Sequence, residues 1–510
     1  MPSPRNCHSG RVINRARLLP VVAATAAAVA FLAGCGGDQR EGPARSVSSA
    51  PVSTPAVGPP VVEVTPDGLA DAVTLDRVMG HVRAFQQTAD NHGGTRASGT
   101  PGHAASVDYV AGLLRTAGFE VTTPEFGYQR FDAGPVELTA DGDKIDAHVL
   151  EYSAGTGGKS VTGKPVEVGA LGCAPGDYPP AVRDSVAVVT RGQCTFADKA
   201  RTAETAGAVG VVVVNNEPKP MLGSTLGPDD RPGIPVVGIS SDDGQRVRSS
   251  SEVSLSVDAE TTPVTTRNVV AETRTGATDD VVMAGAHLDS VVEGPGMNDN
   301  GSGSAAVLET ALRLGSSPRV PHRVRFAFWG GEEDGLVGST EYVRGLDAAE
   351  RRAIALYLNF DMLASPNGGY FTYDGDDSEH QGAGAGPGGS DGIERVFAKF
   401  YADRGIPLGP NDFDGRSDYG PFIAAGIPSG GVATGAERKK SKEQAEMWGG
   451  TAGEPFDPNY HSPRDTVDNV NTESLAVNAA AVAHAVATYA LATNGPDGVP
   501  AVGVRQRAEG

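Results

Sequence analysis

Apolar runs of strand length alternate with helix-length segments over the second half of the chain, and this alternation limits the fold more than any other feature. Val281–Ala286 and Val324–Trp329 have the composition of buried strands, and Ser304–Leu314 and Leu475–Leu491 have that of helices. Strands that alternate with helices favour a mostly parallel sheet with helices on both faces. The sequence therefore predicts an α/β fold here, with ligands bound beyond the carboxyl ends of the strands.

In the first half of the chain, the predicted secondary structure changes from mainly helical to mainly β near residue 150. Before that point we expect a helical stretch over Leu75–Phe119, interrupted by a loop at Gly94–Gly102, and a strand over Phe119–Phe126. Gly118 is the expected C-terminal cap of the helix. After that point one helix, Phe196–Ala206, lies among short β-rich runs at Pro165–Leu171, Ser185–Thr190, Gly210–Val214 and Ile234–Ile239.

The β-rich region resembles the protease-associated domain, a small insert found within several peptidase families. The resemblance is carried by the run Val188–Phe196, by Lys199 and by Ala206–Gly210. A generic α/β subdomain is the alternative.

The N-terminus has the layout of a secretory signal, with Arg5, Arg11, Arg15 and Arg17 before the apolar stretch Leu18–Ala33. This stretch is shorter than the roughly 20 residues that span a membrane. It ends in Leu-Ala-Gly-Cys35, which resembles the bacterial lipoprotein processing box and implies cleavage before Cys35 and lipid attachment to its sulfur. A plain signal peptide is the alternative. The Ser- and Pro-rich segment that follows should behave as a flexible tether.

Composition narrows the remaining possibilities. The chain has 510 residues, enough for two or three domains, and its formal net charge of -21 argues against a nucleic-acid partner. It contains 4 cysteines. Cys7 lies in the signal and Cys35 at the anchor, so Cys173 and Cys194 are expected to form a disulfide outside the cytoplasm.

Short segments with metal-binding side chains end or follow the predicted strands. His287 and Asp289 are two residues apart on extended chain, which puts both on one face and lets a carboxylate orient a metal-binding imidazole. Asp299 sits on a loop where it could bridge two metals. In the run Glu332-Glu333-Asp334, one glutamate could ligate a metal while its neighbour acts as a general base.

Asp361 follows another predicted strand, and His461 lies far downstream. Each segment alone is weak evidence, because turns, caps and solvated acidic loops look the same. Together, two histidines, two aspartates and a glutamate are suitable donors for zinc. Two Zn²⁺ ions would balance Asp299, Glu333, Asp361 and one hydroxide.

These motifs resemble the secreted bacterial di-zinc aminopeptidases, of the leucyl-aminopeptidase type. That family is related to glutamate carboxypeptidase and the transferrin receptor. The matching runs are His287–Ser290, Asn298–Gly303, Glu332–Glu333, Asn359–Met362 and Tyr460–Ser462.

The resemblance implies a zinc-exopeptidase fold, a mostly parallel mixed sheet flanked by helices, with an inserted protease-associated domain. The implied organisation is a signal peptide at 1–34, a tether at 35–68, peptidase parts at 69–149 and 263–495, the insert at 150–262 and a tail at 496–510.

The resemblance also implies roles for single residues. His287 and Asp361 would hold one zinc ion, Glu333 and His461 the other, and Asp299 would bridge both. Glu332 would be the general base that takes a proton from a bridging water. Tyr460 would stabilise the oxyanion, Asp289 would orient His287, and Arg416 in Gly-Arg-Ser-Asp would hold the substrate.

Two departures from the family pattern concern loops near the site. Asn459 and Arg464 replace cysteines that form a disulfide in some relatives, which predicts a looser loop around His461. The loop Ser429–Gly435 lacks an aromatic residue of the side-chain pocket, so no strict preference for Leu or Phe is expected.

The sequence thus predicts an exported, lipid-anchored metallo-aminopeptidase with two zinc ions, acting on peptides with a free N-terminus at the outer face of the cell membrane. Release from the membrane is an alternative, and the sequence favours a monomer but leaves the oligomeric state open. A carboxypeptidase or dipeptidase of the same fold is one alternative, although it would need more cations than Arg416. An inactive cell-surface binding protein and a single-zinc cyclase are the others, and the intact ligand set argues against both.

Overall fold

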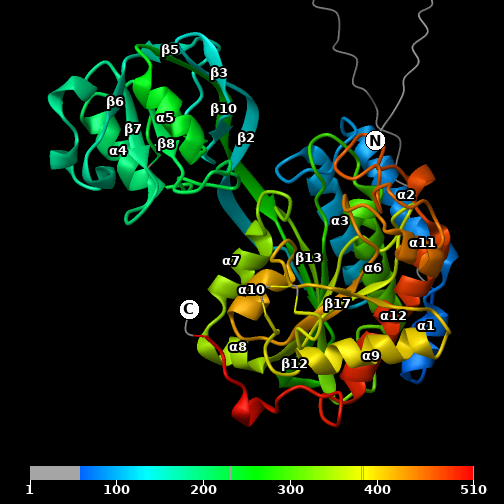
Figure 1. The fold of residues 1–510 in the computed structure, drawn as a ribbon. Helices are drawn as coiled ribbons and strands as arrows, with labels where there is room; N and C mark the ends of the chain where they lie inside the picture. The colour runs from blue at the N-terminus through cyan, green and yellow to red at the C-terminus, as the bar shows by residue number, and fades with distance from the viewer. Residues whose placement is uncertain (1–57, 230, 381, 383, 509–510) are drawn as a thin grey trace, which may run out of the picture. The chain divides into compact units, whose positions relative to one another are not determined.

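The computed structural model describes residues 58–229, 231–380, 382 and 384–508. The predicted signal peptide, Cys35 and most of the tether lie outside these residues. Within the described residues the chain forms one large mixed sheet with helices on both faces and two smaller sheets (Figure 1).

The large sheet has eight strands among the described residues, and its centre is parallel. The order is β1 (Glu120–Thr122), β11 (Val269–Glu272), β13 (His322–Trp329), β12 (Ala277–His287), β14 (Ile354–Phe360), β17 (Ser429–Ala433), β15 (Phe371–Tyr373) and β16 (Gly409–Asn411). β13, β12, β14 and β17 are parallel neighbours. Their carboxyl ends therefore meet at one edge, as the sequence predicts.

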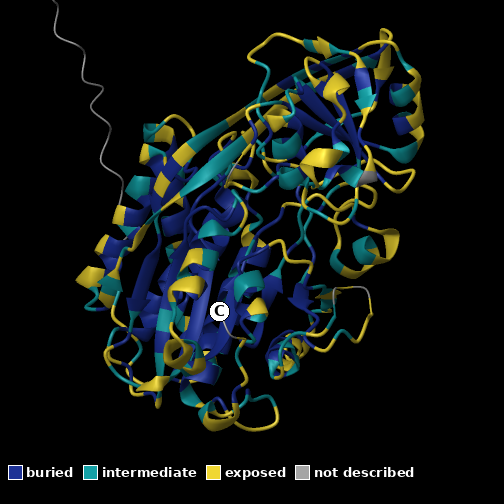
Figure 2. Cartoon of the chain, turned by 90° about the vertical axis from the view of Figure 1, so that its left-hand side faces the viewer, coloured by how far each residue is buried: buried dark blue, intermediate teal, exposed yellow. Residues whose placement is uncertain are grey.

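Side-chain alternation along the central strands explains the layers. In β12, Val282, Ala284 and Ala286 belong to the main core, whereas Met283 points to a second core on the other face. This period of two is that of a strand buried on both faces, and the central strands are dark blue in Figure 2.

Helices cover both faces of the sheet. The main core is closed by α2 (Leu75–Asn91), α3 (Pro101–Thr116), α6 (Gly303–Leu314), α9 (Ser390–Ala402) and α12 (Thr472–Leu491), with α1 (Pro66–Ala72) against α12. The second core is closed by α7 (Val337–Gly345) and α10 (Tyr419–Ala424). Two short helices, α8 (Ala348–Ala353) and α11 (Lys442–Trp448), lie in the connections.

α12 is the one helix of the described residues that is long and apolar enough to span a membrane by length and composition. Its most apolar window is 67% buried inside the fold. It is a core helix of this α/β domain.

The two smaller sheets combine strands of the predicted insert with strands that precede residue 150. One has the order β4 (His148–Val149), β9 (Val236–Ile239), β8 (Gly210–Val214), β7 (Val186–Thr190) and β6 (Pro165–Glu167). The other has the order β3 (Asp143–Ile145), β2 (Glu125–Ala140), β10 (Val253–Arg267) and β5 (Val161–Gly163). The helices α4 (Phe196–Thr205) and α5 (Ser241–Ser249) complete this region.

Most predicted elements are present, with local differences. The helical stretch is observed as α2 and α3, and Gly118 has a φ of 90°, as a glycine just past a helix end should. The strand predicted over Pro165–Leu171 is wrong in its second half, because the chain turns into a short helical turn at Ala170–Gly172. That turn leads directly to Cys173, which forms the predicted disulfide with Cys194.

Candidate active site

The five predicted metal ligands meet at the carboxyl edge of the large sheet. His287 ends β12, Glu333 follows β13 and Asp361 follows β14. Asp299 lies on η4 (Met297–Ser302), the short helical turn before α6, and His461 comes from the loop after α11. Parallel neighbouring strands bring the first three side chains together, and the two loops add the others.

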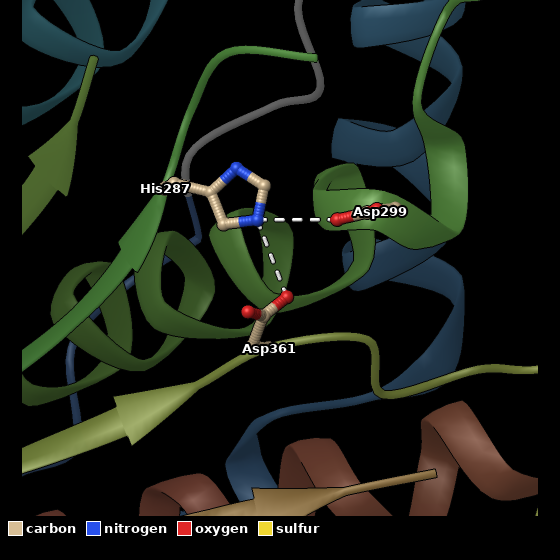
Figure 3. Close-up of side chains that lie close together, drawn as sticks. All are labelled: His287, Asp299 and Asp361. Carbon is tan, nitrogen blue, oxygen red and sulfur yellow. Dashed lines mark hydrogen bonds and ion pairs between the residues drawn. The ribbon is translucent and has the colours of Figure 1, made fainter. Parts of the chain in front are cut away.

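Asp299 lies between the two histidines. Its Oδ1 is 3.2 Å from Nε2 of His287, and its Oδ2 is 3.3 Å from Nε2 of His461. Each histidine also contacts a second carboxylate: His287 Nε2 is 3.2 Å from Oδ1 of Asp361, and His461 Nε2 is 3.0 Å from Oε2 of Glu333. The side chains therefore form two donor groups that share Asp299, and Figure 3 shows the first of them.

Glu332 and Asp289 lie beside the first group. Oε2 of Glu332 is 4.0 Å from Nε2 of His287, and Oδ1 of Asp289 is 3.7 Å from Nδ1 of the same ring. Asp289 also accepts hydrogen bonds from the backbone N–H groups of Gly331, at 2.9 Å, and of Glu332, at 3.3 Å. Its carboxylate thus contacts both a histidine of the cluster and the turn that carries the two glutamates.

The cluster is also held by side chains to which the sequence analysis assigns no role. Ser417 donates a 2.7 Å hydrogen bond to Oδ2 of Asp361. The carboxylate of Asp465 accepts from the backbone N–H groups of Asn298 and Asp299, at 2.8 and 2.9 Å. Ser417 sits within the Gly-Arg-Ser-Asp element, and Asp465 lies four residues after His461.

Arg96 anchors the loop between β12 and η4. Its guanidinium is fully buried and donates to the backbone carbonyls of Leu288, Pro295 and Gly296. Burial lowers the pKa of Arg96 to about 10. The sequence placed Arg96 in the loop Gly94–Gly102 but gave it no role.

The loop around His461 is closed without a disulfide. Arg464 donates to the carbonyl of Pro458 at 3.0 Å, and Ser462 donates to that of Asn459 at 2.6 Å. Hydrogen bonds therefore close the loop where some relatives have cysteines.

The cleft in front of the cluster is polar. Its lining includes Asp299, Glu332, Glu333, Asp361 and Tyr460, together with Arg416 and Arg438. Arg416 donates to the hydroxyl of Tyr460 at 3.2 Å and pairs with Glu437 at 2.8 Å. Arg438, which the sequence did not single out, is the second cation of the lining.

Crowded carboxylates dominate the electrostatics. Burial and the nearby charge of Asp299 raise the pKa of Glu333 to about 8, and burial raises the pKa of Asp418 to about 7. Burial opposes the charge on His461, but its hydrogen bonds to Asp299 and Glu333 outweigh this and raise its pKa to about 10. Oε1 of Glu333 is buried and has no hydrogen-bond partner among the described residues. The cluster therefore combines crowded carboxylates with a buried carboxylate oxygen that is free to bind a cation.

The chain is similar to several proteins named as aminopeptidases. The chain is 48% identical to the probable lipoprotein aminopeptidase LpqL of Mycobacterium tuberculosis, over 97% of this chain and 99% of the relative. Residues 268–486 match the model of peptidase family M28. The chain belongs to peptidase family M28.

This M28 peptidase also carries a PA domain, matched over residues 161–247. It is similar in structure to the aminopeptidase from Aneurinibacillus sp. strain AM-1, with 27% identity, a TM-score of 0.61 and coverage of 83% of this chain and 95% of that one. A zinc aminopeptidase from Bacillus subtilis is 26% identical, with a TM-score of 0.53 and coverage of 82% and 95%. The predictions of an α/β fold, an inserted protease-associated domain and an aminopeptidase of a metallopeptidase family are confirmed.

Proposed function

We propose that this M28 peptidase is a di-zinc aminopeptidase that removes the first residue of peptides. The observation that carries the proposal is the position of Asp299, whose two oxygens each approach a different histidine. A carboxylate that spans two imidazoles, each with a further carboxylate beside it, is suited to two cations at a short separation.

The donor set fits zinc, which takes imidazole nitrogens and carboxylate oxygens. His287 and Asp361 would hold one ion, Glu333 and His461 the other, and Asp299 would contribute to both. Bound zinc would polarise the scissile carbonyl and lower the pKa of the attacking water. The zinc aminopeptidase from Bacillus subtilis supports this choice of metal.

The remaining residues supply the proton transfers and the orientation. Glu332 would take a proton from the attacking water and pass it to the leaving amine. Tyr460 would donate a hydrogen bond to the oxyanion, and burial keeps its hydroxyl protonated by raising its pKa. The acidic cleft would attract the free α-ammonium of the substrate, and Arg416 would hold its backbone.

Metal analysis together with a substrate panel tests the proposal. We expect two zinc ions per chain, hydrolysis of aminoacyl-nitroanilides, and no hydrolysis of peptides whose N-terminus is blocked. The blocked peptides should keep a free C-terminal carboxylate, because Arg416 and Arg438 line the cleft and could bind it in a carboxypeptidase. Turnover of those peptides would indicate a carboxypeptidase, and a metal-loaded protein without any turnover would indicate a binding protein.

We also propose that the protein is exported and anchored by lipid at Cys35 to the outer face of the cell membrane. The name of the lipoprotein aminopeptidase from Mycobacterium tuberculosis supports this, since that relative covers 97% of this chain. Fractionation of cells that express Cys35→Ala tests it. We expect the variant to leave the membrane fraction, and retention there would contradict the anchor.

A further inference from the structure

Asp334, the third carboxylate of the Glu332-Glu333-Asp334 run, takes no part in the chemistry proposed above. Its side chain instead binds two residues of β2. Arg130 donates through Nε to Oδ1 at 2.9 Å and through Nη2 to Oδ2 at 2.8 Å, and the hydroxyl of Tyr128 donates to the same carboxylate. The Arg130 and Asp334 side chains are 13% and 16% exposed. A bidentate pair of this kind fixes orientation as well as distance.

Tyr128 and Arg130 reach the turn from one face of β2, because residues two apart on a strand point the same way. Arg130 also donates to the backbone carbonyl of Ser98 at 2.6 Å, and the Ser98 hydroxyl accepts from the N–H of Gly331 at 2.6 Å. A Cβ atom at Gly331 would lie 3.4 Å from the Tyr128 ring. β2 therefore contacts the turn at both ends, near Gly331 and at Asp334.

The turn between these two contacts carries the proposed general base. The carbonyl of Glu332 accepts from the N–H groups of Gly335 and Leu336, each at 2.8 Å, and Gly331 accepts from Val337 at 2.8 Å. These bonds close a tight turn in which Asp334 lies two residues after Glu332. A displacement of the Asp334 carboxylate would therefore shift the Glu332 backbone.

We propose that Tyr128 and Arg130 are positioning residues that hold Glu332 in place through Asp334, and that they couple the PA insert to the active site. The inference rests on the role proposed for Glu332. β2 pairs with β10 from Glu125, opposite Arg267, to Ala140, opposite Val253 (Figure 1). Val253 also pairs with Gly163 of β5, which lies within the PA match. One continuous strand thus joins the insert to the turn, so a partner or substrate that moves this ribbon would move the base.

Kinetics on four variants of the metal-loaded protein test the positioning role. We expect Arg130→Gln and Asp334→Asn each to lower kcat about tenfold or more, because small misplacements of a catalytic group are costly, while KM changes less than about twofold. Arg130→Lys should recover part of the loss. The double variant Arg130→Gln/Asp334→Asn should lose no more than the worse single variant, because the two residues act as one unit.

A matched control exists on β13. Arg323 pairs with Glu272 at 3.2 Å, with side chains 18% and 20% exposed. Among the described residues, neither forms an ion pair with the turn at 330–336. We expect Arg323→Gln to keep the kcat of the unchanged protein. Tyr128→Phe removes one hydroxyl and keeps the ring, so it tests the positioning role if the arginine variants do not fold.

Hydrogen exchange of the metal-free protein gives a readout that does not depend on activity. In Arg130→Gln and Tyr128→Phe we expect faster exchange in the peptide that covers Gly330–Leu336, and in Arg323→Gln no change there. Unchanged exchange of this peptide, or a kcat equal to that of the control, would overturn the inference. Failure of the positioning role can be distinguished from failure of the proposed function. If the proposed function is wrong, the protein without any substitution lacks aminopeptidase activity.

Discussion

The carboxylate of Asp289 accepts a 3.3 Å hydrogen bond from the backbone N–H of Glu332. The same carboxylate lies 3.7 Å from Nδ1 of His287 and is fully buried. The sequence predicts that Asp289 orients His287. The structure adds that Asp289 also contacts the turn of the proposed base, so one buried carboxylate links a proposed metal ligand to the proposed proton-transfer residue.

We therefore expect Asp289→Asn to weaken metal binding and turnover together. Partners behind a metal-binding histidine typically contribute 10- to 100-fold in affinity or activity, and a loss of about that size is expected here. Zinc titration against a competing chelator measures it. Asp279→Asn is the control, because Asp279 is an exposed aspartate of β12, the strand that ends at His287. Equal zinc affinities in the two variants would contradict the predicted role.

Glu332→Gln should separate metal binding from catalysis. The amide keeps the size of the side chain but cannot accept a proton, so we expect normal zinc content and a fall in kcat of about 10² to 10⁴. Glu341→Gln, at a carboxylate that is 46% exposed on α7, controls for the loss of one charge. Turnover of Glu332→Gln at the rate of this control would show that another group is the base.

Removal of the metal should abolish activity and lower stability. Without cations, the cluster keeps the carboxylates of Asp299, Glu333 and Asp361 buried or nearly so around two histidines. A ligand that binds only the folded state adds about 2.7 kcal/mol at 100 times its Kd. Calorimetry should therefore show a lower Tm after chelation and recovery with zinc. Full activity in protein stripped of metal would rule out the mechanism.

The sequence predicts that three of the proposed ligands meet, because parallel strands carry them. His287, Glu333 and Asp361 end or follow adjacent strands, so the order of the sheet brings them together without further information. His461 could be placed only by resemblance, since nothing local shows where a loop folds back.

Contacts between distant segments could not be predicted in the same way. Arg130 and Asp334 are 204 residues apart, and Asp289 and Glu332 are 43 apart. Neither pair has a characteristic spacing or periodicity. A charged residue near a motif is usually solvated, so the sequence alone does not distinguish Asp334 from a surface residue.

The hydroxyl of Tyr460 lies at the cleft and accepts a 3.2 Å hydrogen bond from Arg416, while Arg416 also pairs with Glu437. Arg416 therefore orients the hydroxyl and leaves its hydrogen free to donate. A single oxyanion donor typically contributes about 10² to 10³ in kcat.

We accordingly expect Tyr460→Phe to lower kcat by about that factor with little change in KM, because the oxyanion forms only in the transition state. Arg416→Gln should lower kcat less, since the tyrosine remains, but should raise KM if the arginine also holds the substrate backbone. Steady-state kinetics on one aminoacyl-nitroanilide distinguish the two patterns. A Tyr460→Phe variant that changes KM alone would place the hydroxyl on the ground-state substrate and would leave the oxyanion to other donors.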